Sequence, residues 1–530
     1  MAHHHTAVPN HLNSEAAWSY HNATSHSYAS IRTHQHFLDF ANQPIPFKIY
    51  PTLEPSRLPG EVRQTGVAAL SAISTIIPEP TNAAPDLKAV AQLLYLSAGI
   101  TRHRKYPGGE IYFRAAACTG ALYEVELYLV CGDLAGLPSG VYHFAPAEFG
   151  LRKLRAGDYR KVLVEATANE PAIAHAPLTM VCTGTYWRNA WKYQERTYRH
   201  FGWDNGTLLA NLLAVATALG LPGKVVCGFV DATVNGLLDV DSEREVAFSL
   251  VALGHSSELP SQTVAQVSTE VSPLGLETVP LSGHEIDYPL MREMHAASSL
   301  HSPEEVAAWR ARAAVVSSAV RNLPSPTGPV VQLKPLSDAE IPRDPIEQVI
   351  LRRGSSRKFA QTPISLAQLS TLLDRATRGV PADFLDPMGS QLNQLYVIAH
   401  AVKDLYAGAY VFHRDRGLLE CLKTGDFRAQ AGYLGLEQQL PADAAVDIFF
   451  LADLRPILQR FGNRGYRAVQ LEAGMIGGKL YLAAYAQRLG ATGLTFYDDD
   501  VIRFFSPHAE GKSAIFLVAV GNSAKQKPTD

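Results

Sequence analysis

The chain has 530 residues, which at about 150 residues per domain suggests three to four domains. Lys and Arg number 47 while Asp and Glu number 50, so the net charge of −3 argues against a protein that coats nucleic acid. Apolar residues make up 47% and charged residues 18%, enough for large buried cores. The chain contains no run of about 18 apolar residues, so we predict no membrane-spanning helix.

The N-terminal residues contain no apolar segment, so we do not expect a secretory signal peptide. The three histidines at residues 3–5, natural or added, are assigned no function. Five cysteines form neither a CxxC pair nor a set with metal-ligand spacing: Cys118, Cys131, Cys182, Cys227 and Cys421. A small, odd number of cysteines is typical of a reducing compartment, and we expect a cytoplasmic protein.

A shift of 268 residues aligns the chain with itself over roughly 100 residues. The matches keep one order and one spacing: Leu127 and Tyr128 with Leu395 and Tyr396, Gly140, Tyr142 and Phe144 with Gly408, Tyr410 and Phe412, Arg196, Tyr198 and Arg199 with Arg464, Tyr466 and Arg467, and Asp231 with Asp499. So many matches at one shift indicate two diverged copies of a globular domain. Such copies usually pack together as a covalent pseudo-dimer.

Each copy is predicted to contain the same elements in the same order. In the first copy we expect a helix at 87–99, strands at 121–131 and 140–144, a long helix at 207–221, a strand with an acidic turn at 225–234 and a last strand at 246–254. In the second copy we expect the corresponding elements at 364–379, 393–402, 408–412, 472–490, 493–501 and 514–521. Helices around a sheet of a few strands predict an α+β fold.

The copies are expected to be separated by a linker. We predict an N-terminal extension at 1–84, a first domain at 85–255, a linker at 256–340 and a second domain at 341–525. The linker begins with a stretch rich in Ser, Thr and Pro. It then contains a predicted helix at 302–322, where Ser302 is suited to cap the N-terminus.

The segment 352–359, RRGSSRKF, precedes the first helix of the second copy. Guanidinium groups and hydroxyls on one short turn can clamp a phosphate, because arginine binds phosphate through two parallel hydrogen bonds. The alternative interpretation is a solvated basic turn.

Lys192 and Tyr193 form a second candidate site. A lysine beside a tyrosine is expected to lower the pKa of the phenol and to form an acid/base pair. The alternative is an ordinary helix surface. The second copy has Arg460 and Phe461 at these positions, and phenylalanine cannot transfer a proton. We therefore expect chemistry at this position only in the first copy.

Other motifs are rejected. The segment 474–480, GMIGGKL, lacks the spacing of a phosphate-binding P-loop, and neither G-x-G-x-x-G after a strand nor G-x-S-x-G is present. His34 and His36 lack a third ligand, so we expect no metal. Asp498, Asp499 and Asp500 are interpreted as turn caps.

Together these features resemble the nitroreductase-like flavoprotein superfamily, and within it the tandem-domain SagB-type (thiazoline/oxazoline) dehydrogenases. The similar segments are 36–59, which looks like that family's leader segment, 113–130, 192–199, 216–221, 227–238 and the clamp at 352–359. The resemblance covers roughly residues 25–522. It implies two nitroreductase-like domains with FMN held at their interface, cytoplasmic location, a small-molecule or modified-peptide substrate and partner biosynthetic enzymes.

The resemblance also implies roles for individual residues. Arg353, Ser355 and Arg357 would hold the FMN phosphate and ribityl chain, with Lys525 as a weaker phosphate ligand. The loop Ala117-Cys118-Thr119-Gly120 would reach the flavin from the other half, although it lacks the family's usual proline. Gly493, Leu494 and Thr495 would place backbone groups near the reactive edge of the ring. Lys192 and Tyr193 match the pair to which azoline-oxidising members assign proton removal.

The two copies depart from the family pattern in opposite ways. The first copy lacks the arginine clamp before its first helix, and the second has Asp386-Pro387-Met388-Gly389 at the position of the small-residue loop. This complementary loss predicts one composite site and one FMN per chain.

Three functions remain open from the sequence. The first is an FMN-dependent dehydrogenase that oxidises thiazoline or oxazoline rings by proton removal and hydride transfer to FMN N5. The second is an NAD(P)H-dependent nitro or quinone reductase. The third is a flavin-free module that binds a peptide or a partner enzyme. Cys118 and Cys227 are candidates for redox activity, although buried structural cysteines are more common.

Overall fold

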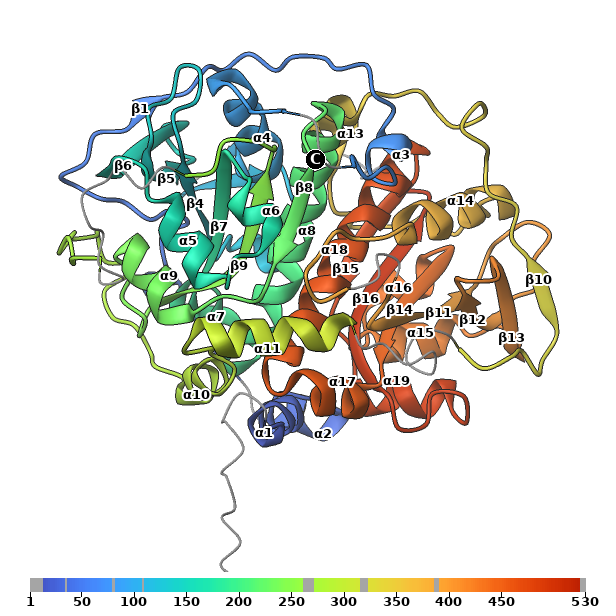
Figure 1. The fold of residues 1–530 in the computed structure, drawn as a ribbon. Coiled ribbons are helices and arrows are strands. Elements are labelled where there is room, and N and C mark those ends of the chain that lie inside the picture. Colours follow the sequence, from blue (N-terminus) through green and yellow to red (C-terminus); the bar gives the residue numbers. More distant parts are fainter. Residues whose placement is uncertain are drawn as a thin grey trace, which may run out of the picture.

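The computed structural model describes residues 13–33, 36–78, 82–106, 109–260, 271–314, 323–385 and 390–524. Its main feature is a pair of seven-stranded antiparallel sheets, one in each half of the chain (Figure 1). Their strand orders, β1-β6-β5-β4-β7-β9-β8 and β10-β13-β12-β11-β14-β16-β15, place corresponding strands at corresponding positions. The predicted duplication and the α+β class are therefore confirmed.

The first sheet contains β1 (Ser56–Arg57), β4 (Val125–Cys131), β5 (Gly140–Ala145), β6 (Gly150–Ala156), β7 (Leu178–Thr185), β8 (Gly223–Val226) and β9 (Glu245–Leu253). The second contains β10 (Val330–Gln332), β11 (Asn393–Ala399), β12 (Gly408–His413), β13 (Leu418–Thr424), β14 (Val446–Ala452), β15 (Gly490–Leu494) and β16 (Ser513–Gly521). A separate two-stranded ribbon consists of β2 (Ile100–Tyr106) and β3 (Gly109–Arg114).

The helices of the first half are α1 (Glu15–Ala23), α2 (Tyr28–Thr33), α3 (Ala69–Ala72), α4 (Leu87–Ala98), α5 (Arg160–Ala166), α6 (Pro171–Ala174), α7 (Tyr186–Tyr193), α8 (Thr197–Ala218) and α9 (Asp231–Leu238). The linker and second half contain α10 (Pro289–Ala297), α11 (Pro303–Ala314), α13 (Ile346–Arg352), α14 (Leu366–Thr377), α15 (Arg428–Leu434), α16 (Gln439–Asp443), α17 (Leu454–Phe461), α18 (Arg464–Ala486) and α19 (Asp498–Phe505).

The long helices α8 and α18 lie side by side between the two sheets (Figure 1). Both are buried along almost their whole length, so nearly every side chain faces protein. Gly206 of α8 and Gly474 of α18 are related by the 268-residue shift, and they face each other where the helices cross. A Cβ atom on Gly206 would lie 2.5 Å from Gly474, and one on Gly474 would lie 2.5 Å from the carbonyl oxygen of Trp203. This glycine contact lies on the pseudo-twofold axis of the chain.

Ion pairs join the two halves reciprocally. Arg196 and Arg199, at the start of α8, donate to Asp498 at the start of α19. Arg464 and Arg467, at the start of α18, donate to Asp231 at the start of α9. All six side chains are buried. The Arg-x-Tyr-Arg repeat in the sequence is therefore the signature of the interface between the halves.

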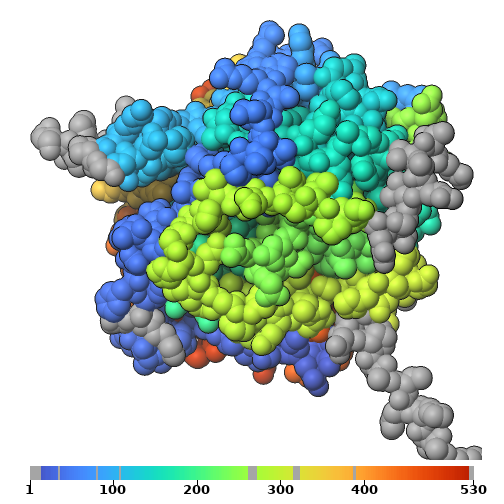
Figure 2. Space-filling view, turned by 90° about the vertical axis from the view of Figure 1, so that its left-hand side faces the viewer, coloured from blue at the N-terminus to red at the C-terminus, as the bar shows by residue number. Residues whose placement is uncertain are grey.

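The N-terminal extension and the linker wrap around this pair of domains. The α1 helix contacts the second half, where the backbone N–H of Ala17 donates to Asn463. The chain then crosses the first half, where Lys48 pairs with Glu245. Figure 2 shows this blue segment beside the yellow-green linker on one face of the molecule.

The structure corrects several details of the sequence analysis. The first long helix begins at Thr197 rather than at residue 207, and both predicted acidic turns are the first turns of helices, α9 and α19. The counterpart of Asp231 is Asp498, not Asp499, since these two residues accept the reciprocal arginine pairs. The β2–β3 ribbon was not expected.

The predicted linker helix is present as α11 (Pro303–Ala314), and the hydroxyl of Ser302 accepts from the N–H of Glu305 as an N-cap. Residues 315–322 lie outside the described part. Among the helices that are described, none combines the length and apolar character needed to cross a membrane.

The close contact of Gly206 with Gly474 leads to a prediction about stability. We expect Gly474→Ala to lower the free energy of unfolding by about 1–3 kcal/mol, because the new methyl group meets backbone that cannot move aside. The matched control is Gly236→Ala in α9, where a Cβ would meet nothing within 4 Å. That change should raise stability by up to about 1 kcal/mol. Chemical denaturation of both variants provides the measurement, and equal effects would contradict the proposed close crossing.

Candidate functional site

The arginine-serine segment follows α13 and lies beside the end of the second sheet. The N–H of Ser356 donates to the carbonyl of Ala491 in β15, and the hydroxyls of Ser356 and Ser523 lie 2.7 Å apart. Ser355 Oγ lies 3.3 Å from Tyr481 Oη, and this phenol also accepts from the N–H of Gly493. Tyr481 therefore connects the clamp segment to β15.

Arg353 joins the clamp segment to the first half. Its guanidinium is buried and donates to the carbonyls of Ala115, at 3.0 Å, and Arg114, at 3.3 Å. These carbonyls belong to the strand that leads into the small-residue loop at 117–120. Arg353 thus holds that loop against the second domain, while Arg357 is exposed and forms no ion pair among the described residues.

Lys192 and Tyr193 form the last turn of α7 and lie at the same boundary. Lys192 Nζ lies 5.3 Å from the centre of the Tyr193 ring. His200 packs edge-on against that ring, with centroids 4.7 Å apart. Gly120 has a φ of +63°, and a Cβ there would lie 2.9 Å from Tyr193 Oη. The fold therefore places the loop directly over the phenol.

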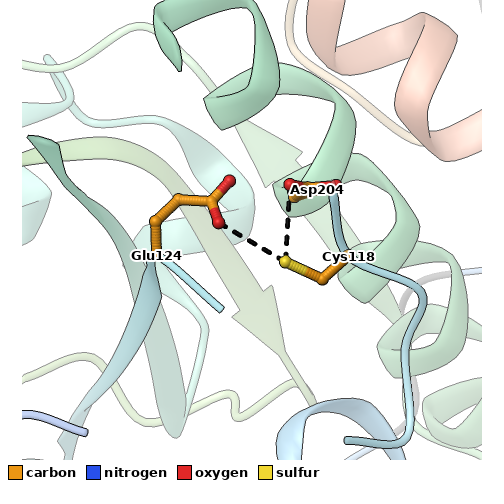
Figure 3. Close-up of side chains that lie close together, drawn as sticks. All are labelled: Cys118, Glu124 and Asp204. Carbon is orange, nitrogen blue, oxygen red and sulfur yellow. Dashed lines mark hydrogen bonds between the residues drawn. The ribbon is translucent and has the colours of Figure 1, made fainter. Parts of the chain in front are cut away.

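Beneath this loop lies a cluster of Cys118, Glu124 and Asp204 (Figure 3). Cys118 Sγ lies 3.4 Å from Glu124 Oε2 and 3.5 Å from Asp204 Oδ2. The N–H and hydroxyl of Thr119 both donate to Asp204 at 2.9 Å. Glu124 Oε1 is buried with no hydrogen-bond partner among the described residues. The cluster therefore places two carboxyl groups and a thiol close together without a neutralising ion pair in that part of the chain.

The burial and mutual proximity of the cluster residues shift their pKa values. Burial, and then the nearby Glu124, raise the pKa of Asp204 well above its usual value. Burial, with Asp204 and Glu124, also raises the pKa of the Cys118 thiol. Cys118 is therefore protonated at neutral pH, which argues against a reactive thiolate. Cys227 is buried, and burial raises its pKa too.

The expected activation of the tyrosine is wrong. Burial and the nearby Asp204, Cys118 and Glu124 raise the pKa of Tyr193 instead of lowering it. The pKa of Lys192 is lowered, first by burial and then by the positive charge of Arg357. The geometry therefore makes Lys192 the better base and keeps Tyr193 protonated as a hydrogen-bond donor.

The remaining predicted residues lie as follows. Gly493 and Leu494 are the last residues of β15 rather than a turn, and Thr495 follows, 3.3 Å from the ring of His26. Phe516 of β16, the strand paired with β15, packs against Trp203 of α8, with centroids 5.1 Å apart. Lys525 lies outside the described residues.

The pseudo-symmetric position has different chemistry. The chain after α3 is Ile73-Ser74-Thr75-Ile76-Ile77, without an arginine. All of these residues except Ser74 line a small hollow together with Lys479, whose Nζ donates to the carbonyl of Gly379. Burial lowers the pKa of Lys479 to about 7. The loop at 386–389 lies outside the described residues. The difference observed between the two halves is therefore the arginine clamp, which the first half lacks.

Sequence reasoning missed Tyr481, Glu124 and Asp204. A signal for Asp204 existed, because the 268-residue shift pairs it with Glu472, a second carboxyl group at the same position of the other long helix. Glu472 accepts from the backbone N–H groups of Leu392 and Asn393, just as Asp204 accepts from Thr119. No comparable sequence signal identified Tyr481.

The residues where the clamp segment of the second half meets the loop at 117–120 of the first half have side chains that suit FMN. Ser355 and Arg357 offer a hydroxyl and a free guanidinium to a phosphate, whereas the pseudo-symmetric position offers isoleucines. Gly120 leaves backbone accessible beside Tyr193, where a side chain would collide.

Comparison with known proteins agrees with the duplicated fold. The family model described as "Nitroreductase family" matches residues 82–255 and 350–522. A crystal structure of a provisionally assigned nitroreductase from Anabaena variabilis is similar with a TM-score of 0.75 and 24% identity, covering 97% of this chain and all of that one. This likeness shows the tandem fold.

Two curated relatives match part of the chain. MJ1384 of Methanocaldococcus jannaschii, a provisionally named nitroreductase, is 25% identical over 172 residues, covering 32% of this chain and 82% of that protein. The trifolitoxin-processing protein TfxB of Rhizobium leguminosarum bv. trifolii is 30% identical over 162 residues. That match covers 30% of this chain and 43% of TfxB, less than half of its length.

The loop over Tyr193 can be tested with two glycines of similar backbone. Gly120 (φ +63°) and Gly66 (φ +76°) both lie in the left-handed region, but a Cβ at Gly66 would meet nothing within 4 Å. We expect Gly120→Ala and Gly66→Ala each to cost about 1 kcal/mol of stability. Only Gly120→Ala should displace the phenol and lower oxidoreductase turnover. Comparable turnover in the two variants would contradict a functional contact between the loop and Tyr193.

Proposed function

Because the chain belongs to the Nitroreductase family, we propose that it is an FMN-dependent dehydrogenase that oxidises azoline rings in a modified peptide. The observation that carries this proposal is the meeting of complementary parts from the two halves. The second half contributes Ser355 and Arg357, and the first contributes the loop at Gly120 with Lys192 and Tyr193. The similarity to TfxB, a protein named for trifolitoxin processing, supports a peptide substrate.

FMN would supply the two-electron acceptor for the ring. A thiazoline or oxazoline becomes aromatic by losing a proton and a hydride from neighbouring atoms; bound FMN would accept the hydride, and oxygen or another acceptor would be needed to take the electrons from it. In this chain Lys192 Nζ takes the proton, since partial burial of the amine lowers its pKa while the side chain still reaches solvent. Tyr193 Oη stays protonated and donates a hydrogen bond that orients the ring. Arg357 holds the phosphate, and burial, the larger cause of the Lys192 shift, favours the neutral amine.

The composite arrangement predicts one FMN per chain. Absorbance of the purified protein, with flavin quantified after denaturation, should give a ratio of about one. Arg357→Ala should lower FMN affinity by at least about tenfold, since a charge-assisted phosphate contact is worth about 1.5–3 kcal/mol. Arg416→Ala, at another exposed arginine of the second half, is the control and should bind normally. Two flavins per chain would show that the isoleucine-lined position also binds FMN.

The roles of Lys192 and Tyr193 predict a pH profile. Turnover should rise with pH as Lys192 loses its proton, with the midpoint below the ordinary lysine value of 10.5. Lys192→Ala with Tyr193→Phe should abolish turnover of a thiazoline peptide, followed by mass spectrometry, while FMN stays bound. Arg460→Ala, at the equivalent position of α17, is the control. Full activity of the double variant would refute the assignment, and rapid flavin bleaching by NADPH would favour a reductase.

A further inference from the structure

The β2–β3 ribbon is an insertion in the first half that projects from the body of the molecule. It follows α4, whereas no strand lies between α14 and β11 in the described residues of the second half. In Figure 2 the light-blue segment near residue 100 extends at the left edge of the molecule. Its two strands pair with each other and with no other strand in the described part of the chain. Each strand therefore has an outer edge free of strand partners.

The two faces of the ribbon differ in charge. On one face Arg102 pairs across the strands with Phe113, and Arg104 pairs with Ile111. Both guanidinium groups lie within 6 Å of the Phe113 ring, at 5.6 and 5.9 Å. This face contains no carboxylate. We call it the cationic face, and it consists of Arg102, Arg104, Ile111 and Phe113.

The opposite face is satisfied internally. His103 stacks on Tyr112 with centroids 4.7 Å apart, and Glu110 accepts from both side chains. Tyr112 also packs against Phe47 of the N-terminal segment. Apart from the exposed Lys105, the polar side chains of this face already have partners, so the cationic face is the one more available to a ligand.

The ribbon is fastened to the proposed active site through Arg353. The guanidinium of Arg102, in β2, donates to the carbonyl of Arg353 at 3.1 Å. The guanidinium of Arg353 donates in turn to the carbonyl of Arg114, the last residue of β3. The base of the ribbon thus lies beside the clamp segment.

Positive charge continues from the ribbon into the site. The cationic side chains of the ribbon, of the end of α7 and of the exposed part of the clamp segment form no ion pair among the described residues: Arg102, Arg104, Lys105, Lys192, Arg357 and Lys358. A phosphate of FMN would neutralise Arg357 and leave the others available. The whole chain has a net charge of −3, so this concentration is a local feature.

We propose that the β2–β3 ribbon docks an acidic, extended segment of the peptide substrate and directs the peptide toward Lys192. An extended peptide adds to an open strand edge through backbone hydrogen bonds, and alternate side chains then face the cationic face. Acidic side chains complement Arg102 and Arg104, and apolar ones complement Ile111 and Phe113. This inference rests on the proposed function, because it names the class of peptide which the site would oxidise.

The test uses a fluorescein-labelled peptide of alternating Glu and Val, with binding to the full-length protein followed by fluorescence anisotropy. We expect it to bind at least about tenfold more tightly than a Lys–Val peptide, and binding should weaken as salt increases. A Glu–Pro peptide, which lacks N–H groups at alternate positions, should also bind more weakly. Arg104→Glu should reduce Glu–Val binding by at least about tenfold. Arg104 forms no polar contact with the clamp segment among the described residues, so FMN content should be unchanged.

The matched control is Lys153→Glu in β6, which makes the same change of charge at another exposed position. Docking on the ribbon is refuted if Arg104→Glu binds the Glu–Val peptide like the wild type, or if the control loses as much affinity. It is also refuted if NADPH, rather than the peptide, binds in a manner that depends on Arg104. Because binding is measured separately from turnover, a protein that oxidises no azoline but still shows Arg104-dependent peptide binding would overturn only the proposed function.

Discussion

The reciprocal arginine–aspartate bridges are the constraint on which the rest of the molecule depends. Each aspartate and its two arginines come from opposite halves, and all are buried. Removing one partner of such a pair leaves an unneutralised buried charge, which costs about 3–5 kcal/mol. The arginines hold the pKa of Asp231 at about 2 and that of Asp498 still lower, so both remain ionised at neutral pH. Each half depends on the other for the partners of these buried charged side chains, and the two halves are therefore held in one relative position.

That fixed position allowed the two crevices of the pseudo-dimer to diverge. A homodimer must build both sites from one sequence, whereas a duplicated chain can change each independently. Here the crevice at Arg353 joins the second half's clamp segment to the first half's loop, and its counterpart contains Ile73, Ile76 and Ile77. The contact of Gly206 with Gly474 keeps the central helices close for both crevices. The halves thus remain symmetric in their packing while they differ in their chemistry.

Features with a periodic or repeated signal were predictable from the sequence. The helices α4 and α14 were expected from the sequence, and the 268-residue shift predicted paired domains with an Arg-x-Tyr-Arg repeat. The same shift gave Asp499 instead of Asp498, because a strict register cannot allow for a one-residue difference between loops. The ribbon was missed because its exposed strands, rich in Arg, Lys and His, do not show apolar alternation. The Tyr193 pKa is raised by burial and then by Asp204 and Glu124, and no sequence signal indicated that these carboxyl groups are its neighbours.

The carboxyl cluster explains how adjacent residues acquire different roles. Lys192 and Tyr193 are neighbours in the sequence, but α7 presents them to opposite charges. Burial is the main cause in both cases; Arg357 from the second half adds to it at the lysine, and Asp204 with Glu124 from the first half adds to it at the tyrosine. Burial and a positive neighbour shift the amine toward its neutral form, while burial and negative neighbours keep the phenol neutral. The lysine can then accept a proton, while the tyrosine can only donate a hydrogen bond. Since the acting charges come from different halves, this division of roles requires the interface that the reciprocal ion pairs hold in place.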